Sequence, residues 1–390
     1  MNLDEIRRNF PVLSNSIYLN TGGTGPISIN IAKEIQNIYE YARDYGPDTP
    51  KVKSDLEGRM EDTRHLTADL LNVPISSIAF TRAISEGMNI VAHGMNWNEG
   101  DEIIVSSEEH PSGIMPWLNL RDKFGVKVVK VKISDDKNTF LNELDDLINK
   151  NTKLISLSHV TTDTGHKLPA KEICDLAHQN GVAVIFDGAQ SVGQFPIDLI
   201  DIGCDFYSFT AHKWLLGGWG VAGFYVNPEW IDKLNISWTG AYAGVWDRGL
   251  KDDVVYETTA HKFEFGGRQK PLYIAMGLAI EYINSLGINN IEKRVSKLTE
   301  KLKSGLADIP NVIMRSPNNL DFCTGIVTFS LGKLHGDQLS EEMLNRNILG
   351  RPSLRHTNIS GIRISTAFFN NENELDSVLN AVYDISNSFK

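Results

Sequence analysis

Short apolar runs alternate with amphipathic stretches through the first two thirds of the chain. The runs at residues 76–81, 101–107, 126–133, 153–160, 181–187, 204–210 and 220–227 predict strands. Helical patterns lie between several of them, one opening at Ser54 with Glu57 as a capping box, others from about residue 85, through Trp117 and over residues 171–181. Because parallel strands need long crossovers, this alternation indicates an α/β fold with a mainly parallel sheet covered by helices.

A different pattern begins near residue 255. Residues 270–303 are mostly helical in pattern, shorter strands follow at 311–316, 324–330 and 361–367, and a helix closes the chain over residues 373–389. We therefore expect a large domain over residues 15–255 and a smaller α+β domain over residues 256–390, which also takes up residues 1–14.

Composition adds mainly exclusions. The chain has 390 residues, of which 22% are charged, and a formal net charge of −11 without a basic block. A nucleic acid or an anionic membrane as main partner requires clustered Lys and Arg, so neither is expected. Three widely spaced cysteines indicate neither a disulfide framework nor a metal site, and they favour a reduced, cytoplasmic setting. The N-terminal residues show no apolar signal segment, and no apolar run predicts a membrane span.

Four predicted strands end close to residues that could take part in chemistry. These residues are Ser85 after strand 76–81, His110 after strand 101–107, Asp187 and Gln190 after strand 181–187, and Thr210, His212 and Lys213 after strand 204–210. Ligands of open α/β sheets bind at the carboxyl ends of the strands. We therefore expect a single ligand to reach all four strand ends.

Each of these residues also has an ordinary interpretation when taken alone. An aspartate at a strand end is usually a turn or cap residue, and a lysine after a strand is usually solvated. His110 alone fits a loop histidine, and Ser85 alone fits a helix N-cap. Only their combination indicates a specific chemistry.

That combination matches the parts that pyridoxal phosphate (PLP) requires. PLP needs a lysine amine for a Schiff base, a carboxylate that keeps the pyridine nitrogen protonated, and a helix N-terminus with hydroxyl groups for its phosphate. Lys213 would supply the amine, Asp187 the carboxylate and Gln190 a hydrogen bond to the phenolic oxygen. The remaining predicted contacts are stacking by His110 and phosphate binding by Ser85, Thr210 and His212.

The segment from Asp187 to Lys213 resembles the PLP signature of the class V aminotransferase family, which includes cysteine desulfurases, isopenicillin N epimerase and cystine C–S lyases. Residues 18–28, 109–117 and 361–366 resemble further motifs of this family, so the resemblance covers nearly the whole chain. It implies a fold-type-I homodimer with its active site at the subunit interface.

The resemblance also implies roles for single residues. Lys213 would be the Schiff-base lysine and the proton shuttle, with His110 as the second catalytic residue. Arg363 would hold the substrate α-carboxylate, since a guanidinium binds a carboxylate at two points, although a surface arginine on a strand is the ordinary alternative. Asn20, in the segment 18–28, and Arg268 are expected near the substrate.

One departure from the family narrows the reaction. Cysteine desulfurases carry a nucleophilic cysteine on a loop shortly before the carboxylate-binding arginine, but residues 349–363 contain no cysteine. Cys323, at a strand start, is predicted to be buried, and Cys174 occupies a helix core position. Persulfide formation on the enzyme by the usual route is therefore not expected.

Other departures concern cofactor contacts. Ile84 stands before Ser85 where the family often has a pair of threonines. Gly266-Gly267 replaces the Gly-Thr that reaches the partner subunit's phosphate, so one contact is lost or Arg268 replaces it. Thr162 stands where an asparagine near the phenolic oxygen is common, which leaves that hydrogen bond open.

Three functions stay open at this point. The first is β-elimination by a C–S lyase acting on cysteine, cystine or a cysteine conjugate; the second is an epimerase or aminotransferase on the same scaffold. The third is a PLP-binding module without catalysis, which the presence of Lys213, Asp187 and Arg363 disfavours. Arg351 and Arg355 are consistent with a second acidic group on the substrate, or with ordinary solvated surface charge.

Overall fold

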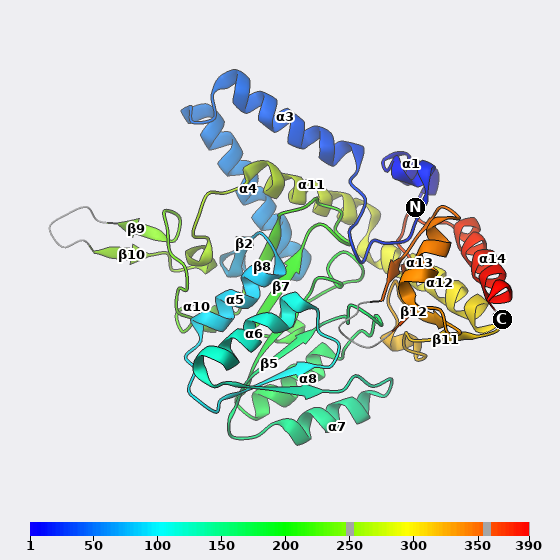
Figure 1. Ribbon diagram of the computed structural model, residues 1–390. Helices are drawn as coiled ribbons and strands as arrows, with labels where there is room; N and C mark the ends of the chain where they lie inside the picture. Colours follow the sequence, from blue (N-terminus) through cyan, green and yellow to red (C-terminus); the bar gives the residue numbers. More distant parts are fainter. Residues whose placement is uncertain (247–252, 354–359, 390) are drawn as a thin grey trace.

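A computed structural model describes residues 1–246, 253–353 and 360–389. Its central element is a seven-stranded sheet in the order β2–β8–β7–β6–β5–β3–β4 (Figure 1). The strands are β2 (Ile78–Thr81), β3 (Glu102–Ser106), β4 (Lys127–Val131), β5 (Thr152–Ser158), β6 (Ala183–Asp187), β7 (Phe206–Thr210) and β8 (Ala222–Val226). Only β8 runs against its neighbours, and the remaining neighbouring pairs are parallel. The predicted, mainly parallel sheet is therefore confirmed.

Helices cover both faces of this sheet because successive strand residues point to opposite sides. Ile103 and Val105 of β3 share a buried cluster with α5 (Ile84–Gly94) and α6 (Pro111–Phe124). Ile104, between them, belongs to a second cluster with α7 (Lys137–Leu147) and α8 (Ala170–Gln179). Strands buried on both faces have continuous apolar runs, which is the pattern that predicts them.

Three long helices lie beside β2. Helices α3 (Ile29–Tyr45) and α4 (Pro50–Leu71) form a pair at the top of Figure 1, and α11 (Lys270–Leu286) packs against α4 and α3. The predicted helix start at Ser54 is wrong: Thr49 is the N-cap and Pro50 occupies the first turn. Proline suits that position because it lacks an N–H that would have no helical partner there. The sequence pattern does not predict α3.

The C-terminal part forms a smaller unit around a second sheet. Its antiparallel strands are β11 (Val312–Met314), β12 (Ile326–Leu331), β15 (Ile362–Ser365) and β14 (Arg351–Pro352), in that order. Helices α12 (Ile288–Ala307) and α14 (Glu372–Ser388) pack together and share a buried cluster with β12, and α13 (Gly336–Leu344) packs against α14 and β15. This confirms the predicted strands and closing helix.

The two units meet at Gly287, where α11 and α12 join at an angle of 76°. Helix α11 packs on α4 of the large unit, whereas α12 packs on α14 of the smaller one. β1 (Ile17–Tyr18) pairs with β13 (Ile348–Leu349), which ties the N-terminal α1 (Leu3–Arg8) and α2 (Val12–Asn15) to the smaller unit. The domain boundary proposed from the sequence stays a prediction.

The remaining elements are short. They are α9 (Leu199–Ile202), α10 (Pro228–Ile231), the 3-10 turns Ile75–Ser77, Ala260–Phe263 and Leu320–Phe322, and the hairpin of β9 (Gly244–Trp246) and β10 (Val254–Tyr256). The hairpin projects from the rest of the molecule at the left of Figure 1. In the described residues no single helix has the length and apolar character to cross a membrane, and the bent pair α11–α12 reaches them only when both helices are joined.

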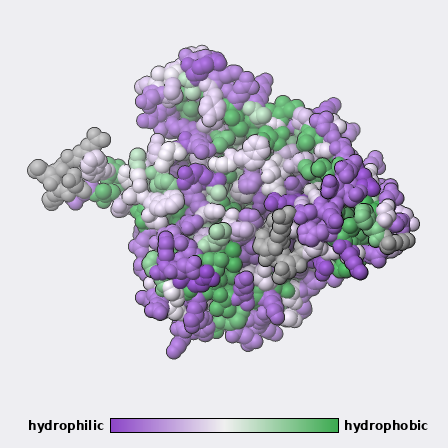
Figure 2. All heavy atoms as spheres, in the orientation of Figure 1, coloured by the Kyte–Doolittle hydropathy of each residue, from purple (hydrophilic) through white to green (hydrophobic). Residues whose placement is uncertain are grey.

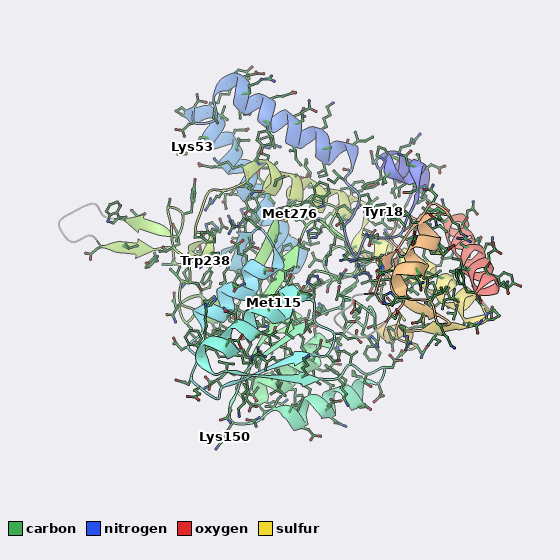
Figure 3. All side chains as sticks on the ribbon, in the orientation of Figure 1. Tyr18, Lys53, Met115, Lys150, Trp238 and Met276 are labelled. Atoms are coloured by element: carbon green, nitrogen blue, oxygen red, sulfur yellow. The ribbon has the colours of Figure 1, made fainter. Side chains whose placement is uncertain are left out.

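The surface is mixed in character. In Figure 2 hydrophilic residues dominate over α3 at the top, and hydrophobic patches lie in the middle and lower parts of the same face. Exposed apolar side chains include Met115 on α6 and Trp238 near the base of the projecting hairpin, both labelled in Figure 3.

Candidate active site

A cavity of about 240 Å³ lies at the carboxyl edge of the large sheet. It collects residues that follow β2, β3, β5, β6 and β7, together with two arginines of the smaller unit. Eight of the predicted site residues line it: Ile84, His110, Asp187, Gln190, Thr210, His212, Lys213 and Arg363. The structure therefore brings together residues that are up to 279 positions apart in the chain, as the strand-end argument predicts.

The charges of Asp187 and Lys213 interact in this cavity. Asp187 is the last residue of β6, is 4% exposed, and accepts a hydrogen bond from the Ala189 N–H at 2.8 Å. Burial raises the pKa of Asp187, while the charge of Lys213 opposes the shift. Burial lowers the pKa of Lys213 to about 8, with Asp187 opposing and Arg363 and Arg351 adding to the decrease. In a substantial fraction of the molecules the Lys213 amine is therefore neutral near pH 8.

Gln190 is held in one orientation by its neighbours. The Trp214 indole N–H donates to Gln190 Oε1 at 2.9 Å, and Gln190 Nε2 donates to the carbonyl of Gly22 at 2.9 Å and to Thr162 Oγ1 at 3.3 Å. Both N–H groups of Gln190 Nε2 therefore have partners in this structure, and the longer bond, to Thr162 Oγ1, is the one that a cofactor oxygen would replace. Sequence reasoning assigns no role to Trp214, although it follows Lys213 directly.

His110 is the N-cap of α6 and is partly buried. Its Nδ1 accepts a hydrogen bond from the Ser112 N–H at 3.1 Å, which fixes one edge of the ring at the helix start. The preceding residue, Glu109, is buried and also has no role in the sequence-based prediction. The only local signal for it is its position next to His110.

The N-terminus of α5 lies at another side of the cavity. Its N-cap is Ala83, which forms no side-chain cap, and Ala83 and Ile84 both line the cavity. Backbone N–H groups at a helix start, with the helix dipole, attract anionic groups. Ser85 is not the N-cap and is not among the lining residues.

Thr210 and His212 complete this side. Thr210 Oγ1 lies 2.6 Å from His212 Nδ1, and both residues line the cavity. Burial lowers the pKa of His212 to about 4, with the charge of Lys213 adding to the decrease, so its ring is neutral at pH 7. This side of the cavity therefore offers the Thr210 hydroxyl, the neutral His212 imidazole and the start of α5, and the predicted contribution of Ser85 stays a prediction.

Arg363 lies in β15 and is 2% exposed. Its Nη1 donates to the carbonyl of Thr162 at 2.7 Å, whereas Nε and Nη2 are buried without a partner among the described residues. Burial lowers the pKa of Arg363 to about 10, so it remains a cation at pH 7. Two adjacent unfilled N–H donors fit the two oxygens of a carboxylate.

Arg351 adds a second cation to the cavity. It lies opposite Arg363 in the register of β14 and β15, lines the cavity, and is exposed at its mouth. It forms no ion pair with an acid in the described parts of the chain. Arg355, the other arginine considered from the sequence, lies outside the described residues.

The segment 18–28 approaches the cavity through glycines. Gly22 and Gly23 line it, while Asn20 does not, because the Asn20 side chain packs next to Gly23 and its carbonyl accepts from the Gly23 and Thr24 N–H groups. Tyr18 lies between the two units in Figure 3, and its hydroxyl donates to the carbonyl of Thr24 at 2.6 Å. The substrate contact predicted for Asn20 stays a prediction.

Gly267 and Arg268 lie elsewhere in this chain. They line a separate cavity of about 40 Å³ beside Phe80 and Arg82. Arg268 pairs with Glu264 at 3.0 Å and stacks over the ring of Tyr242. Within one chain these two residues therefore do not meet Lys213, and their predicted roles at the site stay predictions.

The cysteines lie away from the cavity. Cys174 and Cys204 are buried, and burial raises the pKa of both thiols. Cys323 is partly exposed, with its Sγ 2.9 Å from Lys303 Nζ, so the prediction that it is buried is wrong. In the described ranges no group of three or more His, Cys, Asp or Glu residues could hold a metal ion.

The chemistry of the cavity fits PLP. A lysine amine of lowered pKa, a buried carboxylate, an oriented amide, an imidazole and a helix start are the groups that this cofactor needs, and all line one cavity. The two N–H donors of Arg363 that have no partner also indicate a site for an anionic ligand.

Comparisons with known proteins support this interpretation. A probable cysteine desulfurase of Methanothermobacter thermautotrophicus is 30% identical over 339 residues, covering 86% of this chain and 82% of the relative. A solved C-DES mutant with glycine covalently linked to the PLP cofactor has a TM-score of 0.90 at 25% identity, covering 97% of this chain and 99% of that chain. The complex of the cystine C–S lyase C-DES with its product cysteine persulfide has a TM-score of 0.89 at 25% identity, covering 96% and 99%.

The family model "Aminotransferase class-V" matches residues 17–378, which include every lining residue of the cavity. The chain therefore belongs to the aminotransferase class-V family of enzymes.

Proposed function

We propose that this enzyme uses PLP in the cavity around Lys213 to cleave a C–S bond of cystine, cysteine or a cysteine conjugate by β-elimination. The observation that carries the proposal is the meeting of Lys213, Asp187 and the unfilled donors of Arg363 in one cavity. The likeness to the cystine C–S lyase C-DES supports the choice of reaction.

The lining of the cavity supports a role for each predicted cofactor contact. Asp187 would pair with the ring nitrogen, Gln190 would donate to the phenolic oxygen, and His110 would lie against the ring. The start of α5, with Thr210 and His212, would hold the phosphate. When bound, PLP supplies an electron-accepting ring that stabilises the charge left at the substrate α-carbon.

The chain itself must bind the amino acid and move one proton. Arg363 would hold the α-carboxylate through Nε and Nη2, which places the α-carbon toward Lys213. Lys213 Nζ would take the α-proton, a task for which its lowered pKa of about 8 suits it near neutral pH. Burial around both groups excludes competing water.

The cysteine positions favour release of the sulfur product over its transfer to the protein. Residues 349–363 contain no cysteine, and none of the three cysteines lines the cavity. With cystine, the pair of electrons of the Cβ–S bond leaves with sulfur, and one water is consumed. The products are cysteine persulfide, pyruvate and ammonia, which balances all atoms.

Arg351 favours cystine or another substrate with a distal acid. A cysteine molecule has one carboxylate, which Arg363 can hold by itself. Cystine carries a second carboxylate beyond the sulfur atoms, and Arg351 is the additional cation at the mouth of the same cavity.

We also propose a homodimer in which each subunit completes the partner's site. The segment with Gly267 and Arg268 lies outside the cavity of its own chain. The hairpin β9–β10 projects outward and exposes Val245, Trp246 and Val255 (Figure 1). Apolar side chains on an isolated hairpin are unfavourable in water and are expected to be covered by a second copy.

Complementation tests the dimer. Lys213→Ala and Gly267→Asp subunits should each be inactive. After partial unfolding and refolding together, the mixture should regain up to about a quarter of wild-type activity, since about half of the dimers are mixed and one of the two sites in each of these is intact. Absence of any regain, together with a monomer in light scattering, would contradict the shared site.

A substrate panel tests the reaction. The purified protein should be yellow, and Lys213→Ala should remove the borohydride-reducible link to PLP. Cystine, cysteine and cysteine conjugates are then assayed for pyruvate, sulfide or persulfide, and for α-proton exchange in deuterated water. Exchange without pyruvate would indicate an epimerase, and a 2-oxo acid that depends on an acceptor would indicate an aminotransferase. A protein that stays colourless with added PLP would overturn the proposal.

A further inference from the structure

A buried carboxyl group that the proposed reaction does not use lies next to the cavity. It belongs to Glu109, which is 4% exposed and immediately precedes His110. Burying a carboxyl group is costly unless hydrogen bonds compensate, so its partners indicate what it does.

Glu109 is bound to the ends of two neighbouring strands. Its Oε1 accepts from Ser106 Oγ at 2.5 Å and from the Ser158 N–H at 2.9 Å. Its Oε2 accepts from Ser158 Oγ at 2.6 Å. Ser106 is the last residue of β3 and Ser158 the last of β5, and these strands pair in parallel. The carboxyl group therefore ties the segment after β3 to the sheet edge on which the cavity rests.

His110 is fixed from its other side by helix α6. Its Nδ1 accepts from the Ser112 N–H, and its carbonyl accepts from the Gly113 N–H at 2.8 Å. Glu109 therefore adds side-chain bonds to the ends of β3 and β5 beside the backbone bond from the Ser107 N–H to the carbonyl of Val131. The ring position relative to Asp187 and Lys213, which come from β6 and β7, depends on such an anchor.

Gly113 lies close to the carboxyl groups of both Glu109 and Asp187. A Cβ atom added at Gly113 would lie 3.1 Å from Glu109 Oε2 and 3.6 Å from Asp187 Oδ2. The two carboxyl groups thus approach each other on either side of this glycine. Burial, with the charge of Asp187 adding to it, raises the pKa of Glu109 to about 7. An uncharged glutamine should therefore replace much of what Glu109 does near neutral pH.

We propose that Glu109 is a positioning residue that holds the His110 ring against the cofactor by anchoring the segment after β3 to the ends of β3 and β5. The proposal rests on the proposed function, in which the cavity binds PLP and His110 lies against its ring. Glu109 does not line the cavity, so it would act through His110.

A double-mutant cycle tests this coupling. The dissociation constant for PLP is measured by absorbance titration of the apo-protein for wild type, Glu109→Ala, His110→Ala and the double variant. Loss of one ring contact weakens binding by about 10-fold. Glu109→Ala should cause most of this loss in the wild-type background and less than about twofold in the His110→Ala background. An equal loss in both backgrounds would overturn the proposal.

Two further variants separate positioning from folding. Glu109→Gln keeps acceptor and donor atoms in place and should bind PLP within about threefold of wild type. Ser106→Ala removes one of the three hydrogen bonds without touching the cavity, and it should weaken binding by about threefold, again only when His110 is present. If glutamine were as damaging as alanine, the hydrogen-bonded anchor would be excluded.

Glu102 provides the matched control. It is a 9% exposed glutamate at the opposite end of the same strand and bonds to Asn149 at 2.7 Å. Glu102→Ala should leave the PLP dissociation constant unchanged within about twofold, and an effect as large as that of Glu109→Ala would contradict a specific role for Glu109. Failure of the proposed function gives a different result, since wild type itself would then not bind PLP.

Discussion

Among the described residues, two arginines are almost completely buried, and they differ in their hydrogen-bond partners. Arg64 lies in α4 at 0% exposure, and Arg363 lies in β15 at 2% exposure. An isolated buried charge is costly, so each must have a compensating partner or be kept for a ligand. The comparison shows which of the two holds for each residue.

Arg64 has its partners inside the chain. Its Nη1 donates to Glu264 at 2.5 Å and to the carbonyl of Ile78 at 2.9 Å, and its Nε donates to Glu61 at 2.9 Å. Burial acts against the charge, but the two glutamates outweigh it and raise the pKa of Arg64. The residue ties α4 to β2 and to the segment that carries Glu264, so its role is structural.

Arg363 keeps two donors unfilled. Only Nη1 has a partner, the carbonyl and hydroxyl of Thr162, and no acid pairs with the guanidinium in the described residues. Its pKa is lowered to about 10 rather than raised. A buried cation whose donors are filled stabilises the fold, whereas one whose donors are unfilled marks a ligand site.

Replacing Arg363 should have the largest effect on activity, and it should leave the stability of the fold unchanged. We expect Arg363→Gln to lower kcat/KM for cystine several-thousand-fold, about 5 kcal/mol, because the substrate carboxylate loses its buried cation. Tm should not fall, since an uncompensated charge is removed from the interior. Steady-state kinetics and thermal unfolding of the same preparation check both parts.

Arg363→Lys serves as the control. A lysine keeps the charge but offers no fork of two parallel donors, so it should restore only a small part of the activity. Full activity of the lysine variant would mean that charge alone holds the substrate.

Replacing Arg64 should give the opposite pattern. We expect Arg64→Met to destabilise the protein by about 3 kcal/mol, because the buried Glu264 loses one of its two cations and keeps only Arg268. The double variant Arg64→Met with Glu264→Gln should regain part of this loss, since the buried carboxylate is then replaced by an uncharged amide and only the partly exposed Arg268 loses its partner. Thermal unfolding of both variants measures the difference, and a loss that the second substitution does not reduce would contradict the pairing.

Much of the fold could be predicted because strands that are buried on both faces consist of continuous apolar runs. Helix boundaries were harder to predict. Thr49 is the N-cap of α4, although Ser54 and Glu57 have the spacing of a capping box. The hairpin β9–β10 has strands of only three residues each, which is too short for a distinct pattern, and the sequence did not predict it.

The site was predictable where one strand end supplies a distinctive residue. Asp187, Gln190 and Lys213 follow β6 and β7 and meet as expected. Glu109 and Trp214 could not be assigned, because their importance lies in hydrogen bonds to residues distant in sequence, Ser158 and Gln190. Ser85 is of a residue type that often caps helices, but α5 begins at Ile84, so its N-cap is Ala83, two residues before Ser85.

Two buried glutamates also differ in whether they have a charged partner, and this difference predicts how stability depends on pH. Glu264 pairs with Arg64, whereas Glu109 has only hydroxyl and amide donors, and its pKa is raised from 4.5 to about 7. A raised carboxyl pKa means that stability is fully present below the unfolded value and falls as pH rises toward the folded value. Relative to Glu109→Gln, wild type should therefore lose about 3 kcal/mol of stability from about pH 4.5 to pH 7, and no more above it.

Thermal unfolding of the two apo-proteins in a pH series from about 5 to 8 checks this, since other titrating groups cancel in the difference. A constant difference in Tm across the series would show that Glu109 stays ionised, held by its three hydrogen-bond donors.

Arg351 extends the comparison to an exposed arginine and carries the smallest expected effect. It lines the same cavity as Arg363 and adds to the lowered pKa of Lys213, yet water screens much of its charge. We expect Arg351→Gln to raise KM for cystine by about threefold and to leave KM for cysteine unchanged, because only cystine reaches the mouth of the cavity with a second carboxylate. The KM ratio of the two substrates, measured at low and high salt, is the test: the effect should shrink as salt screens the exposed pair. An equal change in KM for both substrates would mean that Arg351 acts through Lys213 or Arg363 rather than on the distal carboxylate. In that case the buried Arg363 would bind the ligand, whereas the exposed Arg351 would only shift the pKa of its neighbours.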